Sequence, residues 1–526
     1  MKQKIKPLAL SLCLLGMVSI PSFAEEVTNQ KVTATSSSTQ EKTVPTVKKT
    51  IKKKHKTVSH QSSISKSVAP ADVSASEASR APDGYVAPPN TVAAQMQYFP
   101  IDIDVPGQSF VSTGPYIGVP WVYSGGDLVI NSPTINEDVA LLNIRKHIRE
   151  KLDALGRGET EDHAHLLLSG IVEGEAMYRH PGNGSTSSDI DLTSAGLDAY
   201  ILGPNTWTSG LISFAYDNSI GSSTNSFNSN ARAESSRVFI SKAFIVIGNF
   251  SKSPIYGTVG QMYVPFGTYS SSMVSSPLTK ALGRVKARAL LVGYQQQAQQ
   301  ALYGSAFIFK GDSYVGSTSR INNGGINVGY RYVVNGIRGD IGGGLLANIA
   351  DSQGLQNNGN STSGPFFAGF GATNNFGNEQ IAHRVPAADL RAILSIGDHI
   401  DVLAEYISAL NSFSKNDLLM NTHGAKPRAL NTEVAYTFTV YAKPTSAALG
   451  YGLTTDALAL GLPAKRYLLV FNTSVWKDTL QSLEFRHDIN YSAGSTATGT
   501  GSSVTQVITG SGRSDNAVTA QFDLYF

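Results

Sequence analysis

The last nine residues of the chain alternate between two kinds of side chain. Apolar residues stand at 518, 520, 522, 524 and 526, and polar or amphipathic residues lie between them. Successive side chains of a β-strand point to opposite faces, so the run predicts a strand with one apolar and one polar face. A soluble protein has little reason to finish on such a strand. We therefore expect it to close a membrane β-barrel, with Phe526 as the signal that the barrel-assembly machinery recognises.

The same two-residue period recurs upstream and predicts an all-β fold, a transmembrane antiparallel β-barrel of about 16 strands. Only 15% of the residues are charged and 50 are glycine, as expected where lipid-facing and lumen-facing residues alternate. The expected strands are 165–177, 191–202, 207–217, 235–248, 254–265, 286–296, 301–310, 324–334, 338–349, 384–397, 399–409, 428–440, 443–452, 466–475, 479–491 and 515–526.

The connections between these strands are alternately long and short. Loop 350–383 is long, for example, whereas Asn335 and Gly336 alone join the two strands before it. Outer-membrane barrels have long extracellular loops and short periplasmic turns. The pattern predicts that both ends of the barrel domain, residues 161–526, lie on the periplasmic side of the bacterial outer membrane, surrounded by its lipid.

The N-terminus has the features of a secretory signal peptide, expected to span residues 1–24. Three lysines among the first six residues precede an apolar stretch, 8–20, and a small residue, Ala24, marks the expected cleavage site. The single cysteine, Cys13, lies within this signal. The mature protein is therefore expected to contain neither a disulfide nor thiol chemistry.

Residues 25–90 form a Ser-, Thr- and Lys-rich segment that we expect to be a disordered periplasmic linker. Residues 1–66 hold 12 of the 42 lysines and arginines but only 3 of the 39 acidic residues, so the rest of the chain is net acidic. A nucleic-acid partner is not expected, because such proteins carry basic clusters on a folded surface or a dedicated arm. The basic tail is either a solvated spacer or a contact with an anionic surface such as peptidoglycan.

Residues 91–160 are expected to form a small α/β region before the barrel, either plug-like or periplasmic. Glu137 and Asp138 suit the first turn of a helix, and Asn136 precedes them as a cap. Apolar residues then recur at three- and four-residue steps as far as Leu155. A helix over 137–155 is predicted.

Motifs for catalysis or cofactor binding are missing from the sequence, including the zinc-protease, phosphate-loop and serine-hydrolase patterns. The densest group of possible metal ligands, residues 161–165, fits a polar strand entry better than a metal site. We expect no enzyme activity, no catalytic residue, no metal site and no cofactor.

Arginines on the polar face of the strands are the better candidates for a functional role. Alternation places Arg331, Arg338, Arg391 and Arg486 toward the lumen, where the guanidinium group can bind carboxylates. Carboxylates share this face. The arginines are therefore either part of a mutually neutralising network or a ladder that guides an anionic ligand.

Loop 350–383 carries aromatic residues among glycines and asparagines. Phe366, Phe367 and Phe370 are candidates for ligand binding, because exposed aromatics in a functional loop often contact a ligand. The loop could fold inward as a constriction or outward as a capture surface. Packing of the three rings into the mouth of the barrel is an equal alternative.

Two segments resemble the LbtU family of siderophore porins, outer-membrane proteins of Legionella, Coxiella and Francisella relatives. They are Pro115–Pro120 followed by Ser132–Leu142, and Asp191–Ala199 leading into Trp207–Asp217. The resemblance implies a barrel of about this strand count and uptake of iron as a ferric siderophore complex. It supplies no site residues. A motif for coupling to an energising inner-membrane protein is not evident near residue 25.

These observations lead to three hypotheses. The first is an outer-membrane transporter or receptor for ferric siderophores, in which iron is cargo. The second is a general porin for small polar solutes. The third is a surface adhesin or envelope anchor that uses the long loops and the basic tail.

Overall fold

The computed structural model describes most of the chain from residue 101 onward. The described residues are 101–105, 108–112, 136–154, 165–182, 184–203, 205–217, 237–298, 300–316, 320–357, 367–371, 379–397, 399–476, 478–500 and 507–525. They all belong to the second of two units, residues 74–526. The predicted signal peptide, the predicted linker and Phe526 lie outside the described residues.

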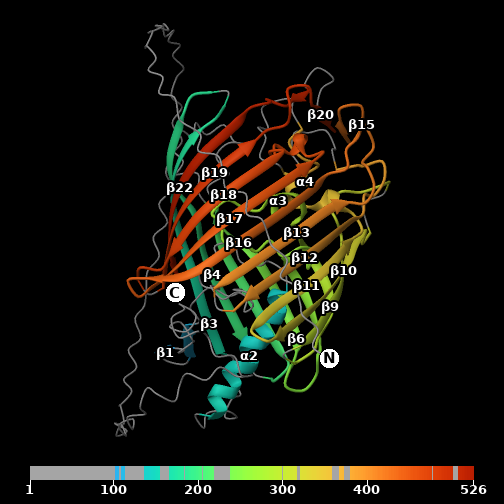
Figure 1. Ribbon diagram of the computed structural model, residues 1–526. Coiled ribbons are helices and arrows are strands. Elements are labelled where there is room, and N and C mark those ends of the chain that lie inside the picture. Colours follow the sequence, from blue (N-terminus) through green and yellow to red (C-terminus); the bar gives the residue numbers. More distant parts are fainter. Residues whose placement is uncertain are drawn as a thin grey trace, which may run out of the picture. The chain divides into compact units, whose positions relative to one another are not determined.

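The barrel wall consists of sixteen antiparallel strands, each paired with its neighbours, and β22 pairs with β3 to close the cylinder (Figure 1). The predicted closed 16-stranded barrel is confirmed. The wall strands are β3 (His165–His180), β4 (Ser187–Leu202), β5 (Thr208–Asp217), β6 (Arg237–Gly248), β7 (Ile255–Tyr263), β8 (Lys286–Gln295), β9 (Ala301–Phe309), β10 (Asn323–Val334), β11 (Ile337–Leu346), β12 (Ala387–Ile396), β13 (Ile400–Ala409), β16 (Arg428–Val440), β17 (Lys443–Thr455), β18 (Lys465–Thr473), β19 (Thr479–Ile489) and β22 (Ser514–Tyr525).

Short strands lie outside this wall. The hairpin of β1 (Ile101–Val105) and β2 (Gln108–Ser112) adds to β3, with β2 parallel to it. A separate small sheet forms among the long connections, and it contains β14 (Leu418–Met420), β15 (His423–Gly424), β20 (Thr496–Gly499) and β21 (Ile508–Thr509).

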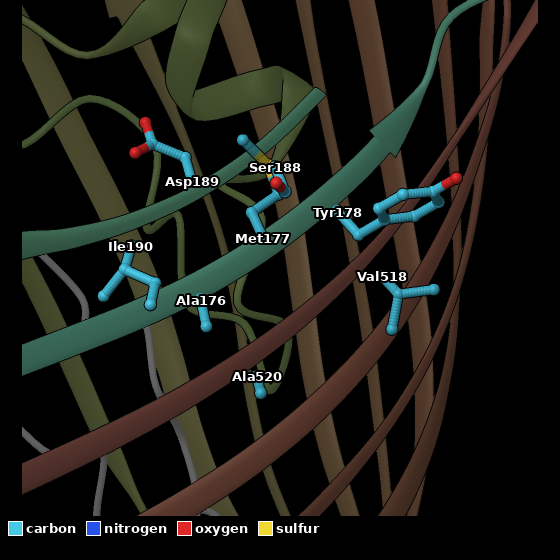
Figure 2. Close-up of a pocket in the computed structure, with 8 residues that line it drawn as sticks. All are labelled: Ala176, Met177, Tyr178, Ser188, Asp189, Ile190, Val518 and Ala520. Atoms are coloured by element: carbon cyan, nitrogen blue, oxygen red, sulfur yellow. The ribbon is translucent and has the colours of Figure 1, made fainter. Parts of the chain in front are cut away.

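The closing seam follows the register that the terminal alternation requires. Asn516 pairs with His180 and Tyr525 with Ile171, so β22 lies beside β3 along ten residue pairs. Figure 2 shows Val518 and Ala520 of β22 beside Tyr178 and Ala176 of β3, around an open hollow on the seam.

The outer face of the barrel is apolar and exposed, the reverse of a soluble protein. On β8, Leu290 and Val292 are half-exposed, whereas Ala289 and Leu291, which alternate with them, are buried inside. The same alternation holds on β13 and β17. Burying these outward side chains in lipid removes apolar surface from water. Among the described residues, no helix has the length and hydropathy needed to cross a membrane.

Two of the short connections are two-residue hairpin turns. Asn335 and Gly336 join β10 to β11 with φ of 51° and 79°, the left-handed values that a two-residue turn of type I′ requires. Tyr441 and Ala442 join β16 to β17 with φ of 48° and 60°. The long connections leave from the other end of the strands and carry the small sheet (Figure 1).

The helices lie among the barrel's connections and before its first strand. The predicted helix over 137–155 is present as α2 (Glu137–Ala154). Two short helices, α3 (Leu278–Gly283) and α4 (Gln353–Gln356), and two turns, η5 (Ile349–Asp351) and η6 (Leu458–Leu460), lie in long connections. Contacts of α3 with β13, β16 and β17 place it against the inner wall.

Candidate functional site

The connection between β7 and β8, residues 264–285, folds into the barrel and is named the internal loop here. Every residue from Val264 to Met273 is buried, which a surface connection would not be. Phe266 and Tyr269 belong to the main apolar cluster of the barrel interior. The loop therefore narrows the lumen from within.

Glu405 on β13 holds the first part of the internal loop. Its carboxylate accepts hydrogen bonds from the backbone N–H groups of Thr268 and Tyr269, the latter at 3.2 Å. The Thr279 hydroxyl donates to the second carboxylate oxygen at 2.6 Å. A buried carboxylate is stable only when such donors satisfy it, so strand and loop depend on each other.

Two further strand glutamates continue this arrangement. Glu433 on β16 accepts from the Ser271 hydroxyl at 2.5 Å and from the Ser272 N–H at 3.0 Å. Glu484 on β19 accepts from the N–H of Ser275 at 3.0 Å and from its hydroxyl. We call Glu405, Glu433 and Glu484 the anchor glutamates. They attach the loop to three different strands of the wall.

Donors from the wall complete the attachment. The Asn472 amide on β18 donates to the Ser272 carbonyl at 2.8 Å. Arg486 on β19 donates to the Ser275 hydroxyl at 2.8 Å, and Arg466 on β18 donates to the Ser276 carbonyl at 3.3 Å. Charged groups strengthen such hydrogen bonds, so the internal loop is a fixed part of the barrel.

The connection between β11 and β12 supports the internal loop from the side. Arg284, which follows α3, donates to the Gln353 side chain of α4 at 2.6 Å, and its carbonyl accepts from the Gln353 N–H at 2.8 Å. Gly354 lies so close that an added Cβ would be 1.8 Å from the Ala281 carbonyl oxygen. Only glycine permits this approach of α4 to α3.

The aromatic residues of loop 350–383 pack inside the protein. Phe367 and Phe370 are fully buried, with ring centroids 5.2 Å apart, and Phe370 stacks on Phe413 at 5.5 Å. Phe366 lies outside the described residues. In this structure, Phe367 and Phe370 pack into the main apolar cluster of the barrel interior, and packing was one of the alternatives for them.

Two of the candidate arginines are held by carboxylates of the wall. Arg391 is 4% exposed and donates to Asp389 at 2.7 Å, with further hydrogen bonds to Asn327 and Tyr303. Arg331 forms an ion pair with Asp340 at 3.6 Å. Both guanidinium groups lie beside the Tyr303 side chain, which Arg331 covers at 5.0 Å from the ring centroid.

The other two candidate arginines differ in their surroundings. Arg486 lies 3.4 Å from Asp488, which also forms an ion pair with Arg466 at 2.7 Å. Arg338 is 9% exposed on β11, opposite Ser395 of β12. The structure thus brings Arg331 and Arg391 together, and places Arg486 at the internal loop.

Acidic side chains with solvent-accessible surface line the inner face of β3 and β4. Glu173, Glu175 and Asp191 are partly exposed there and Asp189 is exposed, whereas Leu167, Ser169 and Ile171 before them on β3 are buried. Glu175 lies opposite Asp191 in the strand pairing. We call Glu173, Glu175, Asp189 and Asp191 the acidic wall.

Lys280 of α3 faces the acidic wall from the internal loop. It interacts electrostatically with Glu173. Burial and the neighbouring Arg284 lower the pKa of Lys280 to about 7, against the opposing effect of Glu173. The positive charge of the loop at this point therefore depends on pH near neutrality.

The sequence pattern did not reveal the internal loop. Alternation placed Glu433 and Glu484 on the inner face but did not show what they bind. Residues 266–285 had the pattern of one more long connection. A signal is present in the run Thr268–Ser276, which is rich in hydroxyl groups that suit buried carboxylates. Among the described residues, no group of three or more His, Cys, Asp or Glu could hold a metal ion.

Comparison with known proteins finds relatives along most of the chain. A UPF0422 protein of Coxiella burnetii is 41% identical over 421 residues, which cover 80% of this chain and 84% of that protein. A UPF0422 protein of Legionella pneumophila (strain Philadelphia 1) is 37% identical, covering 79% and 76%. No family model matches the sequence.

Solved structures with a similar chain path are outer-membrane proteins. The outer-membrane channel DcaP of Acinetobacter baumannii aligns with a TM-score of 0.43 and 13% identity, covering 69% of this chain and 97% of that one. An anion-selective porin from Comamonas acidovorans aligns with a TM-score of 0.42 and 9% identity, covering 69% and 100%.

Proposed function

The chain belongs to the UPF0422 family, and we propose that it is an outer-membrane channel whose internal loop selects the solutes that pass. The observation that carries the proposal is the attachment of this loop to the three anchor glutamates. We place the long connections outside the cell and the short turns in the periplasm.

The fixed position of the internal loop indicates a function, because its attachment requires buried carboxylates in the wall, which are stable only with hydrogen-bond donors. The anchor glutamates are buried carboxylates, and each would destabilise the wall without its donors from the loop. An adhesin or anchor needs long external loops but no such internal attachment. A channel needs one, because a constriction must keep its width while solutes pass.

The charge of the open lumen suggests which solutes are favoured. The acidic wall is accessible, whereas Arg331 and Arg391 are engaged with carboxylates. A surface lined by carboxylates raises the local concentration of cations and repels anions. We infer that cationic or neutral solutes pass more readily than anionic ones.

A ferric siderophore is the proposed physiological cargo. The resemblance of segments 115–142 and 191–217 to the LbtU family supports this choice. The acidic wall adds a condition, since a complex that passes it should be neutral or positively charged. The arginine ladder proposed for an anionic chelate would need the chelate to compete with Asp389 and Asp340 for Arg391 and Arg331.

Two experiments test the channel function and the identity of the cargo separately. Purified protein in planar bilayers should show discrete conductance steps with a preference for K⁺ over Cl⁻. Uptake of a radiolabelled neutral or cationic ferric siderophore should fall in a deletion strain and recover on complementation. Normal uptake with clear conductance would refute the siderophore and leave a general porin, whereas a folded protein that lacks conductance and whose deletion leaves solute uptake unchanged would refute the channel.

A further inference from the structure

The first half of α2 lies against the inner wall of the barrel, beside the internal loop. Leu141 and Leu142 are at most 1% exposed and share an apolar cluster with Phe244 on β6 and Leu291 on β8. Gly248 at the end of β6 is in contact too, because a Cβ there would lie 3.0 Å from the Leu142 side chain. This half of the helix therefore occupies lumen that a channel would otherwise leave open.

Polar contacts attach the start of α2 to the wall. Glu137 forms an ion pair with Lys242 of β6 at 2.7 Å. The Thr258 hydroxyl of β7 donates to Asp138 at 2.7 Å. The two contacts fix the first turn to adjacent strands at the inner end of the helix.

A second pair of polar contacts lies further along α2. Arg145 donates to the Ser209 hydroxyl of β5 at 2.9 Å and to the carbonyl of Asn205, in the short connection between β4 and β5, at 2.5 Å. The Tyr200 hydroxyl donates to the Leu141 carbonyl at 2.9 Å. Asn205 belongs to a short turn, so Arg145 lies at the end of the barrel that carries the short turns. From there, α2 extends into the lumen as far as Glu137.

The inner end of α2 reaches the internal loop. Asn136, Glu137 and Asp138 line a cavity with Tyr263 and Pro265, and the cavity has room for about one water molecule. The helix and the loop thus close this side of the lumen together. The acidic wall lines the side of the lumen that remains accessible.

A buried polar atom in the attachment of α2 to the wall lacks a hydrogen-bond partner. Burial raises the pKa of Glu137, and its Oε2 atom is buried without a hydrogen-bond partner. A buried ion pair with an unsatisfied oxygen stabilises a structure little, because the cost of removing the charges from water offsets their attraction. The ion pair therefore adds little to the attachment, which the apolar face and the hydrogen bonds of Asp138, Arg145 and Tyr200 provide.

We propose that the first half of α2, Glu137–Arg145, is a displaceable stopper that reduces conduction until it leaves the barrel wall. The proposal rests on the proposed channel function and adds a closed and an open state to it. The internal loop stays in place in both states, because hydrogen bonds to the wall strands and to α4 hold it and the anchor glutamates remain paired.

A disulfide across the contact between α2 and β7 tests the stopper. In Asp138→Cys/Thr258→Cys, the two thiols replace side chains that are in direct contact, with their oxygens 2.7 Å apart. The sequence has one native cysteine, Cys13, so peptide mapping identifies the new bond. The single variants Asp138→Cys and Thr258→Cys control for loss of the hydrogen bond.

The readout is conductance of the same protein before and after reduction. The oxidised double variant should conduct weakly, and its conductance should rise by about tenfold when reductant is added. The conductance of the single variants should not change on reduction. In Arg145→Ala, the open state should be more frequent than in the wild type. Gel mobility with and without heating confirms that each barrel is folded.

The outcomes separate the two proposals. Equal conductance of fully cross-linked and reduced protein would overturn the stopper and leave the channel intact. A folded barrel that conducts in no variant, oxidised or reduced, would overturn the channel and the stopper with it.

Discussion

The Ser271 hydroxyl donates a hydrogen bond of 2.5 Å to the Glu433 carboxylate, although the two residues are 162 positions apart in the chain. Ser271 lies in the internal loop and Glu433 on β16, so the bond joins a connection to the opposite wall. It belongs to a set of contacts on β13, β16 and β19 that together hold the constriction.

Replacing Glu433 by Gln should loosen the internal loop without unfolding the barrel. The amide keeps one acceptor oxygen, but the second oxygen that binds the Ser272 N–H becomes a donor. Losing a charged hydrogen bond costs about 1.5–3 kcal/mol locally. Hydrogen exchange of residues 268–276 should therefore accelerate. Glu379→Gln, at an exposed loop position, should leave exchange there unchanged.

The acidic wall should set the ion preference of the channel. Glu173→Gln/Glu175→Gln removes two accessible carboxylates and should shift the reversal potential in a KCl gradient toward Cl⁻, lowering the permeability ratio by about twofold or more. Asp312→Asn, at an exposed position elsewhere, is the matched control. An unchanged reversal potential in the double variant would show that ions follow another path.

Ion preference should also depend on pH through Lys280. Because its pKa is lowered to about 7, the ammonium loses its proton as the pH rises from about 6 to about 8, and cation preference should increase over that range. Stability should rise slightly with pH above 7 as well, because the unfolded chain then binds more protons than the folded one. In Lys280→Arg, which stays charged, the change in ion preference should disappear.

Phe370 tests whether the aromatic residues bind cargo or pack the mouth. Its ring stacks on Phe413 and contacts Phe367, so Phe370→Ala leaves a buried cavity and should cost about 3–5 kcal/mol of stability. Thermal unfolding followed by gel mobility should show the loss, and Phe370→Leu should show less. Reduced siderophore uptake at unchanged stability would instead favour a binding role.

The sequence predicts the barrel well because a strand's two faces follow from its own residues. Alternation identified Leu430, Val434 and Phe485 as outward and Glu433 and Glu484 as inward, and the structure agrees. Turn geometry follows from local pairs such as Asn335-Gly336 in the same way. Such features need no knowledge of distant residues.

The interior could not be predicted because its contacts join distant residues. The bond from Thr279 to Glu405 spans 126 positions, and that from Ser275 to Glu484 spans 209. Which residues meet depends on the closure of the barrel and on the path of the loop. For the same reason, Phe367 could be identified as a candidate for binding or for packing, and only the fold shows it buried.

The central claim is that solutes pass beside the internal loop, and modification of a cysteine there tests it directly. Ser276 is an exposed residue of the loop, and Leu449 on β17 is 63% exposed on the outer face. A cationic thiol reagent should lower the single-channel conductance of Ser276→Cys by about half or more and leave Leu449→Cys unchanged. Complete modification of Ser276→Cys with no change in conductance would contradict the account.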